Sequence, residues 1–221
     1  MRVIGVDGCR GGWLAAVCAD DSVRWRWTAD IRELLALDAT AVAIDIPIGL
    51  PEAGSRACDV QARRLLGARR SSVFPAPPRV VLSCASYAEA RAALAAQSLP
   101  SMSAQAFGIV PAVRQVDAAL TPDDDERIVE AHPELAFRLL RGADLASKKT
   151  ADGQRQRRAA LTAVYPGLDA LLAAAPHPAA VDDALDALAC GWVARRWVSG
   201  EATVLGDGTR DARGLPMRIV A

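Results

Sequence analysis

Two apolar segments of the sequence each run into an aspartate, and a pair of acids placed in this way can hold a cation. Met1–Val6 and Ala41–Ile44 are short and rich in β-branched residues, which is typical of buried strands. Asp7 follows the first segment and Asp45 the second. If the strands are parallel neighbours, both carboxylates lie at the sheet edge where open α/β sheets bind ligands. The alternative for either residue is a structural one, in which it accepts hydrogen bonds from the turn that follows.

A third group of polar side chains occupies five residues near the middle of the chain. Glu130 ends a short strand expected at 127–130, and Pro133 opens a helix that carries Glu134 in its first turn. His132 lies between the two glutamates. A hydrogen-bonded turn would also explain His132, and compensation of the helix dipole would also explain Glu134.

The helix expected over 181–198 supplies the last acids. Asp182, Asp183 and Asp186 lie in its first turns, at spacings of three and four residues that place at least one pair on a common face. The helix dipole favours acids at this end of a helix, but this explanation is weaker for Asp186, which lies farther in.

A site built from carboxylates alone suits Mg²⁺ or Mn²⁺. Such ions activate a water molecule and stabilise the leaving oxygen in the hydrolysis of phosphodiester bonds. The sequence has no GxxxxGK[ST] motif of an ordinary nucleoside triphosphatase and no GxSxG motif of a serine hydrolase. The five cysteines are scattered without CxxC spacing, which disfavours a zinc site or a disulfide framework.

Basic residues gather in the segment 56–79, which has six arginines against one acid, Asp59. Its second half, 69–79, is expected to be a loop of arginines, serines and prolines, and guanidinium groups suit bidentate contact with phosphate. The alternative is that these arginines pair with acids elsewhere in the chain. The candidate substrate-binding residues are Arg10, Arg69, Arg70, Ser71, His132 and Lys149.

Length and composition limit the class of protein. A chain of 221 residues is long enough for one α/β domain, and its 26 basic residues balance its 26 acidic ones. This balance argues against a protein that coats nucleic acid without specificity. No segment resembles a secretion signal or a membrane helix, so we expect a cytoplasmic protein with no membrane partner.

The pattern of apolar residues predicts a mixed sheet flanked by helices. A first strand turns at Gly8–Gly12 into a second at 13–18, and a third follows at 22–28. Helices are expected at 30–37, 56–67, 87–97, 103–120, 134–140, 152–164 and 181–198. Pro111 is expected to bend or divide the helix at 103–120. We predict a single domain over 1–221 with a helical, arginine-rich insertion at about 52–122.

Several motifs together resemble a bacterial domain-of-unknown-function family described as predicted RNase H-like nucleases. They span nearly the whole chain in order: Val3–Trp13, Ile44–Pro51, Arg69–Pro77, Glu130–Glu134, Ser147–Thr150 and Asp182–Ala187. The resemblance implies an RNase H-like fold, in which three antiparallel strands are followed by parallel strands and flanking helices. The described activity makes nucleic acid the candidate partner, although the resemblance indicates the family more strongly than the substrate.

By this resemblance, Asp7 matches the metal ligand of the first strand and Asp45 the acid of the next parallel strand. Asp183 or Asp186 matches the acid of the late helix, and Asp186 is the preferred metal ligand. Glu130 and Glu134 are assigned to catalysis on expected proximity alone. Two other functions stay open: nucleotide-dependent phosphotransfer of the actin-like ATPase or sugar kinase type, and nucleic-acid binding without catalysis.

Overall fold

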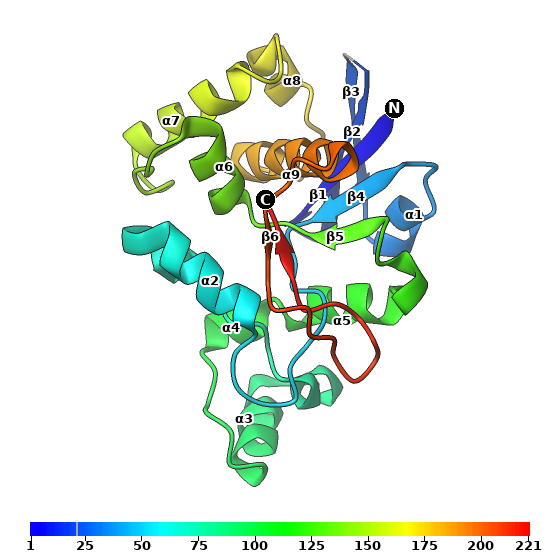
Figure 1. Ribbon diagram of the computed structural model, residues 1–221, viewed down its shortest axis with the longest axis vertical. Coiled ribbons are helices and arrows are strands. Elements are labelled where there is room, and N and C mark those ends of the chain that lie inside the picture. The colour runs from blue at the N-terminus through cyan, green and yellow to red at the C-terminus, as the bar shows by residue number, and fades with distance from the viewer. Residues whose placement is uncertain (21) are drawn as a thin grey trace.

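The computed structural model describes residues 1–20 and 22–221, and a five-stranded mixed sheet lies at its centre (Figure 1). The strand order is β3-β2-β1-β4-β5. The first three strands are antiparallel, whereas β4 and β5 run parallel to β1. The strands span β1 Arg2–Cys9, β2 Gly12–Ala19, β3 Ser22–Thr28, β4 Ala41–Ile44 and β5 Ile128–Glu130. The predicted mixed sheet of antiparallel and parallel strands is therefore confirmed.

The register of the parallel strands aligns their carboxyl ends. Val6 lies opposite Ile44, and Ile44 lies opposite Glu130. The amide of Asp45 donates to the carbonyl of Val6 over 2.9 Å, so Asp45 lies beside the end of this alignment. Asp7 lies within β1 rather than after it, because pairing with β2 continues as far as Cys9 and Gly12.

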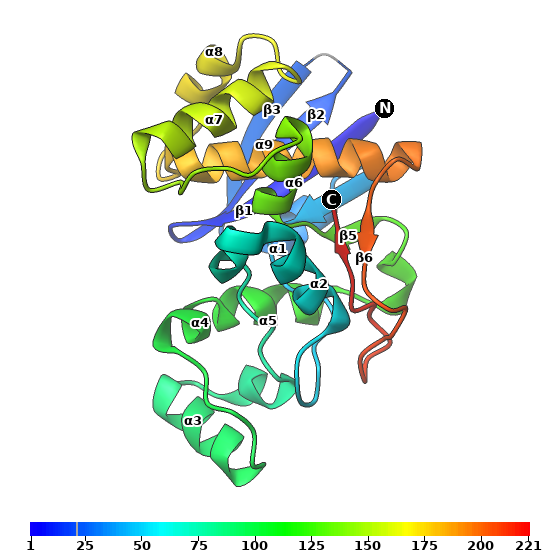
Figure 2. The same ribbon diagram turned by 60° about the vertical axis from the view of Figure 1, so that its left-hand side comes forward.

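Helices cover both faces of the sheet. Alternate residues of β1 divide between the two faces, since Val3 packs in one core and Ile4 and Val6 in the other. The first core is closed by α6 to α9 and the second by α1 and α5, as the two views show (Figures 1 and 2). These helices span α1 Ile31–Leu35, α5 Val110–Ala119, α6 Pro133–Arg141, α7 Ala151–Thr162, α8 Leu168–Ala173 and α9 Val181–Ser199.

The long helix α9 lies directly on β1, with no side chain between the two backbones at their closest point. A Cβ atom added to Gly5 would lie 2.0 Å from the backbone nitrogen of Gly191. On the other side of this contact, Gly191 faces the sulfur of Cys18 and the hydroxyl of Tyr165. The two glycines therefore allow α9 to approach β1 closely, and they fix how its first turns meet the end of the strand.

The predicted insertion, residues 52–122, forms helices α2 to α5 below the sheet in both views (Figures 1 and 2). Its remaining elements span α2 Ala57–Leu66, the 3₁₀ turns η1 Gly67–Ser72 and η2 Arg79–Ser83, α3 Tyr87–Ala96 and α4 Ala104–Gly108. Ala76, Val113 and Val116 pack into the core under the sheet, so this segment closes one face of it. The single-domain division stays a prediction.

The helix expected at 103–120 divides into α4 and α5 at Pro111, as predicted, because proline lacks an amide hydrogen and fits the first turn of a new helix. Two other segments differ from their predicted structure. The loop expected at 69–79 begins in η1 and reaches η2 at Arg79. The short helix α8 was not anticipated.

The end of the chain returns to the sheet. A two-stranded ribbon pairs β6 Val204–Leu205 with β7 Ile219–Val220, and an isolated bridge joins Val220 to Ala131 just after β5. Among the described residues, no helix combines the length and the hydrophobicity needed to cross a bilayer.

Gly5→Ala tests the close contact between α9 and β1. Because the new methyl group would overlap the backbone of Gly191, we expect the free energy of unfolding to fall by about 3 kcal/mol or more. Urea denaturation measures this change. Gly108→Ala is the control, since Gly108 ends α4 with open space around it and its stability should change by less than about 0.5 kcal/mol. Equal stability of the two variants would contradict the assigned contact.

Candidate functional site

A cleft of about 760 Å³ opens at the carboxyl ends of β1 and β4, and Asp7, Asp45 and Asp186 are among the residues that line it. Asp7 comes from β1, Asp45 follows β4, and Asp186 comes from the second turn of α9. Asp7 and Asp186 are buried, whereas Asp45 is half-buried. The contact between α9 and β1 brings these residues together, because Asp7 lies two residues after Gly5 and Asp186 lies five residues before Gly191.

The three carboxylates interact electrostatically. Burial, reinforced by the charges of Asp186 and Asp45, raises the pKa of Asp7 well above its ordinary value. Burial raises the pKa of Asp45 to about 7, and it does the same for Asp186. The three aspartates therefore resist losing all their protons together.

Lys148 is the cation nearest to this group. Its Nζ donates to Oδ2 of Asp186 over 3.0 Å. Burial opposes the charge of this lysine, but Asp186, Asp7 and Asp45 together raise its pKa above the ordinary value. Among the described residues, no cationic nitrogen lies within 4.0 Å of Asp7 or Asp45, and neither carboxylate accepts a hydrogen bond. The alternative that each aspartate accepts hydrogen bonds from the turn that follows it therefore has no support for Asp7 or Asp45.

Asp183 lies near the three aspartates but has a structural partner. Its Oδ2 accepts a hydrogen bond of 2.8 Å from the amide of Ala180 at the start of α9. Its charge contributes to the raised pKa of Asp7, although it does not line the cleft. Of the two candidate ligands on this helix, Asp183 and Asp186, Asp186 is the one that lines the cleft.

The two glutamates also line the cleft, but buried arginines hold both of them. Both oxygens of Glu130 accept hydrogen bonds from Arg56, at 2.6 and 2.7 Å, and one also accepts the amide of Ile48 at 2.7 Å. Both oxygens of Glu134 accept hydrogen bonds from Arg157 at 2.7 Å. These contacts satisfy the two carboxylates within the fold, in contrast to those of Asp7 and Asp45.

Arg56 also organises the segment that follows β4. It is almost fully buried, and it donates to the carbonyls of Ile48 and Gly49 as well as to Asp59. We call Arg56, Asp59 and Glu130 the buried network. It ties the loop after Asp45 to β5 and to α2.

The predicted substrate-binding residues separate into two groups. Arg69, Ser71, His132 and Lys149 line the cleft, whereas Arg70 lines a neighbouring cavity and Arg10 lies exposed at the turn between β1 and β2. Burial lowers the pKa of His132, whose Nε2 lies 3.4 Å from the carbonyl oxygen of Ser72. Its Nδ1 is buried without a hydrogen-bond partner in the described structure.

Sequence reasoning missed two charged residues of this region. Lys149, which is exposed, is named among the sequence candidates, and its half-buried neighbour Lys148 is not, because no local pattern distinguishes the two. Arg157 is buried, although Arg155 and Arg158 of the same helix are not. The spacing of the buried residues of α7, Gly153, Arg157 and Leu161, is four residues and would have indicated this face.

The group at the cleft offers oxygen donors and excess negative charge. Among the described residues, no three Asp, Glu, His or Cys side chains are already arranged as a closed metal site. The group consists of three carboxylates, and the ammonium group of Lys148 balances part of their charge.

Comparison with protein families gives a match over residues 5–210 to the family described as Protein of unknown function (DUF429). The chain belongs to this family. Membership in a domain-of-unknown-function family, predicted from the sequence motifs, is thus confirmed for this DUF429 chain. Comparisons with curated proteins and with solved structures gave no match.

Raised carboxyl pKa values predict a loss of stability as pH rises. The folded protein keeps a proton on Asp45 up to about pH 7, whereas the unfolded chain releases it near pH 4. The contribution of Asp45 to the stability of the protein is therefore greatest below pH 4, and it declines as the pH rises toward 7. Between pH 5 and pH 8 in EDTA, the free energy of unfolding should fall further for the wild type than for Asp45→Asn. We expect the difference between the two decreases to exceed about 1.4 kcal/mol, the equivalent of one pKa unit.

Urea denaturation at several pH values measures this difference. Asp123→Asn removes an exposed acid that does not line the cleft, and this control should follow the wild-type curve. Parallel curves for wild type and Asp45→Asn would contradict the raised pKa.

Glu130→Gln tests whether the buried network maintains the fold. The change leaves Arg56 buried with one compensating charge fewer, so the free energy of unfolding should fall by about 3 kcal/mol. Glu126→Gln, at an exposed position, should change it by less than about 0.5 kcal/mol. If Glu130→Gln unfolds at the same urea concentration as the wild type, the network has no structural role.

Proposed function

We propose that this DUF429 protein is a divalent-cation-dependent nuclease with an RNase H-like fold. Asp7, Asp45 and Asp186 are the proposed ligands of Mg²⁺ or Mn²⁺. The observation that carries the proposal is the convergence of these three aspartates from β1, β4 and α9 on one cleft, where a single ion pair among the described residues, Lys148 with Asp186, involves any of them. Acids that disfavour their own ionised forms occur at functional sites more often than elsewhere.

The order of the sheet supports the fold assignment. Three antiparallel strands precede two parallel ones, and a late helix that crosses β1 carries an acid to the strand ends. This is the arrangement that the family resemblance implied. It brings the first strand, the next parallel strand and the late helix to one edge of the sheet.

The donor set fits a hard divalent cation. All three side chains offer carboxylate oxygens, which Mg²⁺ and Mn²⁺ prefer over nitrogen or sulfur. Two of them have no partner among the described residues, and the third is held by Lys148, whose side chain is 43% exposed. A cation bound here would supply an activated water molecule and stabilise charge on a phosphate.

The residues around the aspartates suit a phosphodiester substrate. Arg69, Lys148 and Lys149 bring positive charge to the cleft, and they are proposed to bind and orient phosphate oxygens. Phe74, which is 38% exposed, offers an apolar surface in the same cleft. Glu130 and Glu134 are proposed to hold the walls of the cleft through Arg56 and Arg157, so neither is assigned a proton transfer.

Nuclease assays with Mg²⁺ and Mn²⁺ test this proposal on single-stranded, duplex, hybrid and branched oligonucleotides. We expect cleavage of at least one substrate and complete inhibition by EDTA. Asp7→Asn and Asp45→Asn should each reduce the rate by about 100-fold or more, because each removes a proposed ligand of the cation.

The matched control is Asp182→Asn, which changes an acid of α9 that does not line the cleft and should retain the wild-type rate. Cation-dependent cleavage that survives both Asp7→Asn and Asp45→Asn would rule out this site. Thermal stabilisation by ATP, with no cleavage of any oligonucleotide, would favour the phosphotransfer function instead.

A further inference from the structure

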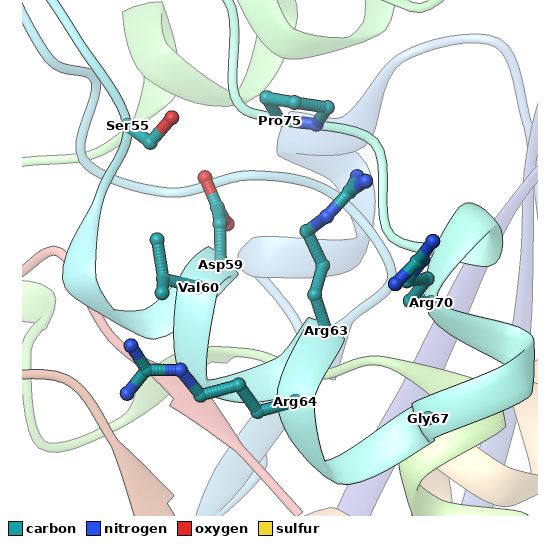
Figure 3. Close-up of a pocket in the computed structure, with 8 residues that line it drawn as sticks. All are labelled: Ser55, Asp59, Val60, Arg63, Arg64, Gly67, Arg70 and Pro75. Atoms are coloured by element: carbon teal, nitrogen blue, oxygen red, sulfur yellow. The ribbon is translucent and has the colours of Figure 1, made fainter.

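A second cavity, of about 610 Å³, lies between α2 and η1 and is lined by three arginines (Figure 3). Arg63 and Arg64 come from α2, and Arg70 comes from η1. In Figure 3, Arg63 extends toward Pro75, whereas Arg64 leaves α2 on the side of Val60. The other lining residues are Ser55, Asp59, Val60, Gly67 and Pro75.

The six arginines of the segment 56–79 divide into two sets according to their partners. Arg56, Arg69 and Arg79 form ion pairs with acids of the fold. Arg63, Arg64 and Arg70 form none within the part of the chain that the structure describes, and these are the three that line the cavity. The unpaired charge of the segment is therefore concentrated at one place.

The one acid of the cavity does not neutralise these arginines. Oδ1 of Asp59 accepts a hydrogen bond from Arg56 over 2.6 Å, and its Oδ2 accepts the amide of Ala76 over 3.1 Å. Asp59 is thus committed to the buried network. Like charges gathered without a counter-ion repel one another, and a bound anion would relieve that repulsion.

The cavity adjoins the candidate site. Asp59 lines both spaces, and the consecutive residues Arg69 and Arg70 line the cleft and the cavity respectively. Arg63 donates to the carbonyl of Val73, which also lines the cleft. A chain of phosphates that leaves the cleft past η1 would meet the three arginines next.

We propose that the cavity between α2 and η1 binds the phosphate backbone of the nucleic acid strand whose scissile phosphate lies in the cleft. The inference rests on the proposed nuclease function. A guanidinium group can pair with two oxygens of one phosphate. A cavity with three guanidinium groups therefore favours a ligand with several linked phosphates over a single small anion. Arg63, Arg64 and Arg70 contact phosphates that are not cleaved.

The test measures binding of a fluorescently labelled 20-nucleotide dT strand in EDTA, where cleavage does not interfere. The double variant Arg64→Gln/Arg70→Gln removes two cavity arginines whose side chains make no hydrogen bond in the described structure, so the fold is not disturbed. We expect affinity at low salt to fall by about tenfold. The dependence of log K on log salt should become shallower by about 1.4, the value for two lost single-strand phosphate contacts.

The matched control is Arg24→Gln/Arg26→Gln, which removes the same charge from exposed positions of β3 at the opposite edge of the sheet. It should retain the wild-type affinity and salt dependence. Equal loss in both double variants, or in neither, would overturn the proposal. A 20-residue polyglutamate that binds more tightly than the dT strand, and depends on Arg64 and Arg70, would also overturn it in favour of an acidic protein.

The outcomes for binding and for cleavage are distinguishable. Loss of binding in Arg64→Gln/Arg70→Gln without any nuclease activity in the wild type would support the phosphate site and reject the nuclease. Cleavage that depends on Asp7, together with binding that is indifferent to Arg64 and Arg70, would support the nuclease and reject the phosphate site.

Discussion

The candidate site depends on one steric constraint, the absence of side chains where α9 crosses β1. Gly5 and Gly191 leave backbone against backbone at this crossing, and any Cβ on Gly5 would collide with the helix. A helix held at this distance delivers Asp186 to the end of the strand that carries Asp7. The position of the third acid is thus set by two residues that have no side chain, and the rest of the site is arranged around that position.

Charge compensation then separates the acids of the cleft by role. Both oxygens of Glu130 and both oxygens of Glu134 accept hydrogen bonds from a buried arginine, which satisfies these carboxylates within the fold. Asp7 and Asp45 receive no such partner within the described structure, and Lys148 reaches Asp186 alone at hydrogen-bond distance. Buried carboxylates without a partner reduce the stability of the fold. Asp7 and Asp45 are therefore present at a cost in stability that Glu130 and Glu134 avoid. The proposed nuclease function gives a reason for that cost.

The sequence predicts the strands and the acids at their ends because both are local patterns: an apolar run, a breaking residue and an aspartate. Asp7 and Asp45 could be named in this way, whereas Asp186 was one of several acids at the start of a helix, and the family resemblance left Asp183 as its alternative. The partners of Glu130 and Glu134 could not, because Arg56 lies 74 positions before Glu130 and Arg157 lies 23 positions after Glu134. Ion pairs across such separations are set by tertiary packing, as is the burial of Arg157 on a helix whose other arginines, Arg155 and Arg158, are not buried. Lys148 and Lys149 illustrate the same limit, since adjacent identical residues differ only in where the fold directs them.

The arginine-rich segment shows how one stretch of chain can serve both the fold and a ligand. Its paired arginines hold the segment in place: Arg56 joins α2 to the loop after β4, and Arg79 joins η2 to Asp117 of α5. Its unpaired arginines, Arg63, Arg64 and Arg70, gain no such partner and lie together at a cavity beside the cleft. Because the whole chain carries equal numbers of acids and bases, net charge gives no sign of this division. The division is seen only when the ion pairs of individual residues are compared. The unpaired arginines then lie next to the unpaired aspartates, as a substrate that contacts both a bound cation and a guanidinium cluster would require.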